Sequence, residues 1–588
     1  MDDDLTLERR KPGLRESEQE HERLTLTMSA SRLFRRGSRP SWLLRQDQTA
    51  EKVPFLGDST AAPRPTARAL VFDLTTLGLL AGIVGVVHAW GMGRYPRFTD
   101  DEGIYVSQAW AVSELHALAP YTYWYDHPPL GWILLAGWAK LVPTFGASLY
   151  SIAAARTFIL AVLIASACLL YLVAVRLALR RVFAAFAVLL FGLSPLALHY
   201  KRMVLLDNIA VGWLLAAFAL VLTPARRPSA YAFAGVCFAG AVLTKETFLL
   251  FLPALVLAIW QSSHGQARRL SLGVFAGLFV LIAGLYPLFA TLRGELFQGA
   301  HHPSLLYGVY WQLTRHGTGS IFDPHSGTRI LVNTWFRLDP IVLGTALSLI
   351  PVGLLLRRLR PVALGLAIPA VMFVRPGAFA PGGYVIGMLP FAALLIAAVA
   401  DWLWRPRAIT VVSPAGSGWS RVANPSIAAA VTLAAIGLTG GLSALAAPRW
   451  VHSDLEQMRM DDSAPTRAAV NWLAMHAVRT DRVLVDDTVW TDLVERGFNH
   501  KRTIVFWKFD RDPAIRLRWS QFNYFVRSNA LAGDLEWVPK TRQVLKHSRT
   551  VAVFQNHVER IEIRRVMRPP ASLIASKPYS SSVRPSAR

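Results

Sequence analysis

Cysteine and acidic residues are scarce in this chain of 588 residues. It holds two cysteines, Cys168 and Cys237, and 38 Asp and Glu against 62 Lys and Arg. Both cysteines lie inside apolar runs, where a thiol behaves as a small hydrophobic group, so we expect neither a disulfide framework nor a thiolate metal site. The sequence also lacks a Gly-rich phosphate loop, which would indicate a nucleotide site, and it shows no internal repeat and no heptad pattern.

Apolar residues, by contrast, are abundant. The chain is 53% hydrophobic and 17% charged, with a mean hydropathy of +0.34, which is typical of a polytopic α-helical membrane protein. A net charge of +24 also occurs in nucleic-acid-binding proteins, but those gather Lys and Arg on a polar surface, whereas here many Arg border apolar runs. We therefore expect a membrane, and no nucleic acid, as a partner.

The apolar runs are long enough to define membrane spans. A helix needs about 20 apolar residues to cross a bilayer, and short helices can cross inside a bundle. By this criterion the sequence predicts about eleven spans, at 69–90, 150–175, 182–199, 204–223, 230–243, 247–260, 271–292, 338–356, 362–374, 384–404 and 426–446.

The loops between these spans alternate in charge. Basic residues gather at 176–181, 224–228, 264–269, 357–360 and 404–421, and Lys and Arg are retained on the cytoplasmic side. Residues 1–68 lack the short apolar run of a signal peptide, and we expect a disordered cytoplasmic tail there. Parity then places residues 98–132, the loop 293–336 and everything after residue 448 outside a multi-pass cell membrane domain at 69–447.

The chain after residue 447 has a different pattern. Alternating runs at 483–487, 503–507 and 551–554 predict short strands, and 464–476 has helical spacing. We predict a small extracytoplasmic α/β domain at 448–568, followed by a disordered tail at 569–588 that is rich in Ser, Pro and Arg.

Three consecutive carboxylates, Asp100, Asp101 and Glu102, follow the first predicted span. A carboxylate within hydrogen-bond reach can remove the proton of an attacking hydroxyl, which is otherwise a poor nucleophile. The alternative is structural, because Asp is a good N-cap for the helix expected to start at residue 103. The residues alone leave both interpretations open.

The motifs around these carboxylates resemble a known family. Asp101-Glu102 is followed, about 25 residues later, by His127-Pro128-Pro129-Leu130-Gly131, as in the protein O-mannosyltransferases that use dolichyl-phosphate-mannose, and in their bacterial relatives. The more distant aminoarabinose transferases of lipid A modification share Asp-Glu but carry Lys-Pro-Pro in place of His127-Pro128-Pro129. The resemblance implies the GT-C fold, with Asp101 as the catalytic carboxylate, Glu102 in support, and Asp100 and His127 near the substrate.

Further elements fit the same resemblance. Arg202 followed by Leu-Leu-Asp207, Lys245 after a Thr, and Tyr384 in a Pro-terminated segment near Arg375 are similar to family elements. The resemblance implies that these residues contact the donor and its phosphate. From the residues alone, a snorkelling Arg or Lys, a structural ion pair of Asp207 or an interfacial Tyr explains them as well.

Two weaker signals remain. The loop 293–336 carries His301, His302 and several aromatic residues, which suit a cover over a lipid-linked sugar. No nearby spacing resembles a zinc site, so a metal is the less favoured interpretation, and a divalent ion stays open. In the outer domain, residues 486–487 and 507–510 are candidates to touch an acceptor, although carboxylates at strand ends are common.

These implied roles predict a glycosyltransferase without a resident cofactor. It would move a mannose-like monosaccharide from a polyprenyl-phosphate donor to a hydroxyl of a protein, lipid or wall glycan, by one displacement with inversion. The first alternative is a transporter or flippase of a lipid-linked saccharide, but such proteins more often show repeated halves. A second alternative is a scaffold that binds envelope components.

Overall fold

The computed structural model of the chain describes residues 67–224, 227–299, 303–314, 317–374, 379, 382–405 and 425–567. All of these residues belong to one compact unit. The predicted site residues Arg375, His301 and His302 lie outside the described residues, as do 1–66 and 568–588, which cover nearly all of the two predicted tails.

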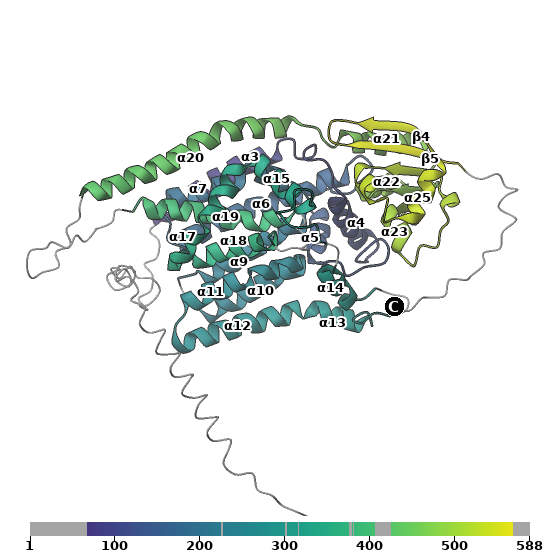
Figure 1. The fold of residues 1–588 in the computed structure, drawn as a ribbon. Coiled ribbons are helices and arrows are strands. Elements are labelled where there is room, and N and C mark those ends of the chain that lie inside the picture. The colour runs from purple at the N-terminus through teal and green to yellow at the C-terminus, as the bar shows by residue number, and fades with distance from the viewer. Residues whose placement is uncertain are drawn as a thin grey trace, which may run out of the picture. The chain divides into compact units, whose positions relative to one another are not determined.

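A bundle of helices forms the larger part of this unit (Figure 1). Its elements are α3 (Ala67–Ala89), α4 (Asp100–Glu114), α5 (Leu130–Ala139), α6 (Ser151–Arg176), α7 (Arg181–Leu193), α8 (Pro195–Tyr200), α9 (Leu206–Val221), α10 (Pro228–Thr244), η1 (Glu246–Phe251), α11 (Leu252–Ser262), α12 (Gly265–Ala283), α13 (Leu285–Leu292), α14 (Leu305–Thr314), α15 (Gly327–Leu338), α16 (Pro340–Ser348), α17 (Ile350–Leu355), η2 (Arg357–Leu359), α18 (Arg360–Met372), α19 (Tyr384–Leu403) and α20 (Pro425–Arg459).

Four helical segments in the described part are long and apolar enough to cross a membrane. They are Leu70–Ala89, Ser151–Arg176, Gly265–Leu292 and Tyr384–Leu403, and shorter apolar helices lie at Leu130–Ala139, Arg181–Leu193, Leu206–Val221, Pro228–Thr244 and Glu246–Ser262. α19 is buried almost along its whole length, whereas α12 is largely exposed. An apolar helix buried all round belongs at the centre of a bundle, and an apolar helix that stays exposed suits contact with lipid.

Each predicted span coincides with helical structure, but several are broken. The span predicted at 182–199 is divided into α7 and α8 at Ser194, because Pro195 takes the first position of the second helix. The span predicted at 338–356 is divided in the same way before α17, which has a proline in its first turn. α4 and α5, which the hydropathy criterion does not select, form between the first two predicted spans.

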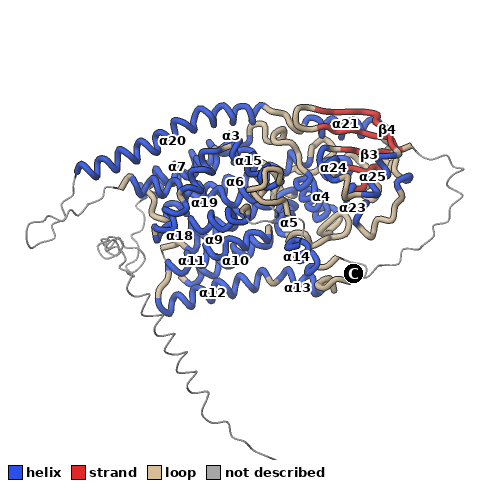
Figure 2. Tube along the Cα trace, viewed as in Figure 1, coloured by secondary structure: helices blue, strands red, loops and turns tan. Residues whose placement is uncertain are grey.

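The strands in the described residues all lie in the C-terminal part (Figure 2). They form one five-stranded mixed sheet of order β2-β1-β3-β5-β4, in which β1 is parallel to β2 and β3, and β5 is antiparallel to β3 and β4. The strands are β1 (Val483–Val485), β2 (Thr503–Val505), β3 (Tyr524–Arg527), β4 (Ser548–Gln555) and β5 (Arg560–Val566). The helices around them are α21 (Ala464–His476), α22 (Asp487–Glu495), α23 (Phe506–Arg511), η3 (Trp519–Gln521), α24 (Asn529–Asp534) and α25 (Pro539–Lys546).

The predicted strands coincide with β1, β2 and β4, and the predicted helix with α21. β3 and β5 have no predicted counterpart, although β5 alternates Ile with charged side chains. α20 continues to Arg459, so the boundary drawn at 447/448 falls inside one helix. The α/β part itself begins at α21.

The α/β part packs directly on α4. A Cβ atom at Gly103 would lie 2.4 Å from the carbonyl carbon and oxygen of Asp487, so only glycine allows α4 and the start of α22 to approach this closely. Trp110 of α4 donates from Nε1 to Glu495 at 2.6 Å, and its ring meets that of Trp490 edge-on at 5.3 Å. The core of the α/β part therefore includes one face of α4.

Candidate functional site

The three carboxylates at the N-terminus of α4 face different surroundings. Asp101 shares one helical face with Ile104, Tyr105 and Gln108, because these positions are three, four and seven residues further along. The N-cap is Thr99, and Glu102 accepts a hydrogen bond from its backbone N–H at 3.2 Å. The structural alternative of an Asp as N-cap is therefore wrong.

Glu102 forms a buried ion pair with Arg156 of α6. Both side chains are fully buried, and Arg156 donates from Nε and Nη2 to the two carboxylate oxygens at 2.9 Å each. The backbone N–H of Val204 donates to the same carboxylate at 2.9 Å. With both oxygens occupied, Glu102 positions α4 rather than acting as a base. Arg156 was not predicted, since nothing in its apolar helix indicates a partner 54 residues away.

Asp100 points into a cleft of about 270 Å³ that it shares with residues of the α/β part, namely Thr466, Asp486, Thr488, Ser528 and Glu559. Its side chain stays open to solvent on one side. Desolvation by the surrounding protein, followed by the charges of Asp101 and Asp486, raises the pKa of Asp100 to about 7.

The predicted residues His127 and Lys245 lie in direct contact. Lys245 Nζ is 2.9 Å from His127 Nε2, and His127 Nδ1 is 3.0 and 3.1 Å from the two oxygens of Glu246. With Lys245 charged, this arrangement fits a neutral His127 that accepts at Nε2 and donates from Nδ1 to Glu246. The phenol of Tyr123 donates to the backbone carbonyl of His127 at 2.7 Å and fixes the loop.

Tyr105 connects this cluster with the Asp101 face of α4. Its ring centroid lies 6.1 Å from that of His127, and it is buried. Burial, and after it the charges of Asp101, Asp207 and Asp126, raise the pKa of Tyr105 well above its usual value. The phenol therefore keeps its proton at neutral pH.

Asp207 and Tyr384 line a second cleft, of about 250 Å³, together with Phe248, Phe251 and Gly387. A Cβ atom at Gly383 would lie 2.9 Å from Oδ2 of Asp207, so the absence of a side chain there makes room for the carboxylate. Lys245 provides a positive charge that acts on Asp207. Four predicted residues, from four separate motifs, are thus brought to one region of the bundle.

Arg202 does not join this region. It is buried and donates from Nη2 to the backbone carbonyls of Val87 and Trp90, at 2.8 and 3.0 Å, at the C-terminal end of α3. Its Nε and Nη1 have no partner among the residues that the structure describes. This geometry gives Arg202 a structural role that the sequence did not suggest, in which its side chain caps the end of a helix.

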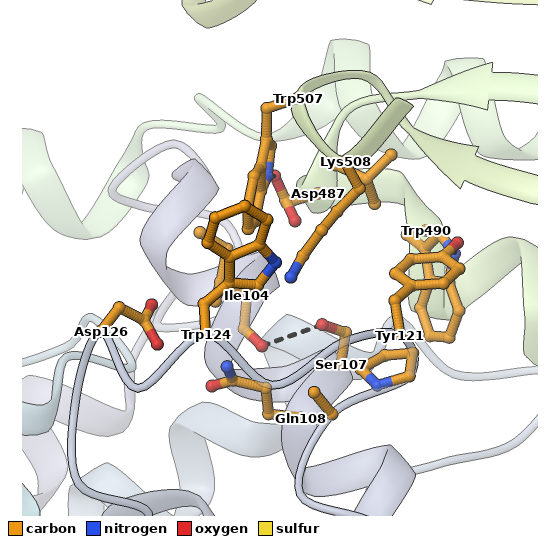
Figure 3. Close-up of a pocket in the computed structure, with 13 residues that line it drawn as sticks. Ile104, Ser107, Gln108, Tyr121, Trp124, Asp126, Asp487, Trp490, Trp507 and Lys508 are labelled. Atoms are coloured by element: carbon orange, nitrogen blue, oxygen red, sulfur yellow. Dashed lines mark hydrogen bonds between the residues drawn. The ribbon is translucent and has the colours of Figure 1, made fainter. Parts of the chain in front are cut away.

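A third cleft, of about 380 Å³, lies between the bundle and the α/β part (Figure 3). α4 and residues 119–126 form one wall, and Asp487, Trp490, Val505, Trp507 and Lys508 form the other. Burial lowers the pKa of Lys508 to about 8, although Asp126, Asp512 and Asp487 oppose this effect. Burial and the neighbouring charges of Asp486 and Asp100 hold the pKa of Asp487 well above its usual range.

The sequence indicated this cleft only in part. Asp487 and Trp507 were acceptor candidates, whereas Lys508, inside the same 507–510 motif, was not singled out. Among the described residues, no three His, Cys, Asp or Glu side chains gather closely enough to hold a metal ion.

The described part of the chain is a polytopic helical membrane protein with polar clefts beside α4 and α9, and solved structures of the GT-C fold share its architecture. The crystal structure of ArnT from Cupriavidus metallidurans bound to undecaprenyl phosphate has the same fold, with a TM-score of 0.50 and 15% identity over 85% of this chain and 98% of that one. The apo structure of the same protein is similar to the same degree, over 85% and 100% of the two chains.

Residues 126–288 match the family model of the dolichyl-phosphate-mannose-protein mannosyltransferases, and this segment contains His127, Asp207 and Lys245. The resemblance inferred from the motifs is thereby confirmed. The apo Archaeoglobus fulgidus oligosaccharyltransferase is also similar, with a TM-score of 0.48 and 11% identity over 82% of this chain and 73% of that one. No curated protein matches the sequence.

Proposed function

We propose that this protein is a membrane glycosyltransferase that moves a monosaccharide from a polyprenyl-phosphate donor to an acceptor hydroxyl. The observation that carries the proposal is the contact of Lys245 with His127 beside the helical face that presents Asp101. A fixed cation and an exposed carboxylate are the two groups that such a displacement needs. The ArnT structure, with its bound undecaprenyl phosphate, supports the choice of donor.

In this mechanism Asp101 removes the proton of the acceptor hydroxyl. The oxygen attacks the anomeric carbon while the bond from that carbon to the phosphate oxygen breaks, and the configuration inverts. The polyprenyl phosphate leaves with the electron pair. Lys245, held by His127 and Glu246, stabilises the charge that develops on the phosphate, because a preorganised cation in a partly buried site needs no reorganisation.

The other residues have supporting roles in this proposal. Glu102 and Arg156 hold the start of α4 in place. The cleft of Asp207 and Tyr384, with its phenylalanine walls, suits the first isoprene units behind the phosphate. Arg375, which lies outside the described residues, remains the candidate for a second cation. The same proposal includes a mannose-like sugar, an extracytoplasmic location of the site and the full set of predicted spans.

Replacing Asp101 by Asn tests the proposal. In lipid nanodiscs, with a radiolabelled polyprenyl-phosphate-mannose donor and an envelope extract as acceptor, transfer by Asp101→Asn should fall by about 10²–10⁴-fold, the contribution of a general base. Glu114→Gln is the matched control, because Glu114 is an exposed carboxylate on the same helix, and it should keep wild-type transfer. Asp100→Asn serves as a separate test of which aspartate is the base.

Two results would contradict the proposal. If Asp101→Asn transfers sugar at the wild-type rate, Asp101 is not the base. If the wild type transfers no sugar but moves the labelled lipid between the leaflets of a vesicle, the flippase alternative holds instead.

A further inference from the structure

The cleft between α4 and the α/β part contains an unusual set of polar atoms. Gln108 Oε1, Trp124 Nε1 and Asp126 Oδ1 are buried there and have no hydrogen-bond partner among the described residues. The Gln108 side chain as a whole is 6% exposed. Buried polar groups in native proteins are almost always paired. Two acceptors and a donor left unpaired in one cleft therefore indicate a ligand with both donors and acceptors.

The fourth polar group comes from the other wall. Lys508 is buried, and its Nζ donates to the backbone carbonyl of Thr122 at 2.9 Å. The ammonium lies 4.3 Å from the ring centroid of Trp507 and 5.3 Å from that of Trp124. Figure 3 shows Lys508 reaching from the α/β part toward Trp124, with Gln108 of α4 nearby. An ammonium has three donors, so two remain for a ligand.

The walls between these polar groups are aromatic. Tyr121, Trp124, Trp490 and Trp507 line the cleft, and the face of an aromatic ring carries partial negative charge. A pyranose ring matches this combination, because its C–H face packs on an aromatic ring while each hydroxyl both donates and accepts. A single Ser or Thr hydroxyl would satisfy at most two of these three unpaired groups, one as donor and one as acceptor, and a lipid chain would satisfy none.

The cleft lies along the same helix as the proposed base. Ile104 and Gln108, which line it, share the α4 face of Asp101, and the helix rises about 10 Å from Asp101 to Gln108. A saccharide of two or three rings seated against Gln108 therefore extends to the level of Asp101.

We propose that this cleft binds the acceptor, that the acceptor is a saccharide, and that Lys508, Gln108 and the tryptophans at 124 and 507 position it for Asp101. The inference rests on the proposed glycosyl transfer and adds the class of acceptor. It also gives the α/β part a direct place in the binding site.

Binding can be measured without turnover. Full-length protein in nanodiscs is titrated with linear trisaccharides of glucose, galactose and mannose, and with a Ser/Thr-rich peptide, by calorimetry. At least one trisaccharide should bind to the wild type and to Asp101→Asn alike. Its dissociation constant should rise about tenfold or more in Lys508→Met and in Gln108→Met, the loss expected for one strong hydrogen bond. Lys501→Met, an exposed lysine in the same part, is the control.

Thermal unfolding separates this role from a structural one. Gln108→Met removes an acceptor that has no partner among the described residues, so it should unfold no earlier than the wild type while it loses saccharide affinity. Earlier unfolding with unchanged affinity would overturn the inference.

Other outcomes distinguish the two proposals. If none of the trisaccharides binds, or if the peptide binds instead and loses affinity in the same variants, the acceptor is not a saccharide, and glycosyl transfer still stands. If a trisaccharide binds in the cleft but the wild type transfers no sugar, the cleft is a saccharide site and the proposed function fails.

Discussion

Glu102→Gln is expected to destabilise the protein by about 3–5 kcal/mol, the range for breaking one partner of a buried ion pair. Glu102 Oε2 receives Arg156 Nη2 at 2.9 Å and the Thr99 N–H at 3.2 Å. In Glu102→Gln, an amide NH2 at the position of Oε2 would point its hydrogens toward the N–H groups of Arg156 and Thr99, which are themselves donors. The Arg156 guanidinium, which is fully buried, would lose its counter-charge and one of two charge-assisted hydrogen bonds, each of which contributes roughly 1.5–3 kcal/mol.

The assay is unfolding in mixed micelles, titrated with SDS and followed by tryptophan fluorescence. Asp461→Asn is the control, because it breaks the more exposed pair with Arg467 and should change stability by about 0–1 kcal/mol. Glu102→Leu and Arg156→Leu should each be severely destabilised, and the double variant should be more stable than the sum of the two predicts, by about 1–3 kcal/mol. A Glu102→Gln protein as stable as the control, or additive Leu variants, would refute the reasoning.

The remaining predictions concern the cleft, the interface and the topology. The Lys508 ammonium has a pKa of about 8 and loses its proton above that pH. The KM of the wild type for acceptor should therefore rise between pH 7 and 9. In Lys508→Met the KM should be raised and should not change with pH over this window. Gly103→Ala places a Cβ 2.4 Å from the backbone of α22 and should destabilise the protein by about 1–3 kcal/mol. If the interface resists protease equally well in the variant and the wild type, this prediction is wrong. A cysteine near Gly533 should react with an impermeant maleimide in intact cells, and one near Arg227 should not; the opposite pattern would reverse the topology.

Much of the bundle could be predicted, because apolar runs and basic loops are local features of the sequence. The breaks at Ser194 and in the 338–356 segment could have been anticipated from the prolines that follow them. α4 was harder, because it is only weakly apolar and is stabilised by contacts with the α/β part rather than by its own apolar content.

The site could be predicted only as far as its motifs were recognisable. His127 and Lys245 were singled out separately, but their contact joins residues 118 positions apart. The role of Arg202 could not be decided, since an Arg that caps a helix and an Arg that binds phosphate look alike in a sequence. Lys508 and Gln108 have no distinguishing pattern at all. Their significance comes from the cleft, which forms only when the two ends of the chain fold together.

The packing of Trp110 within the α/β core has a consequence for biosynthesis. α4, which presents Asp101, has one side covered only when residues 464–566 have been made and folded against it. While the nascent chain is still attached to the ribosome, its lipid-facing helices would already be in place, but the α/β part would not yet cover α4. In the proposed mechanism, transfer therefore requires the α/β part to have folded against α4.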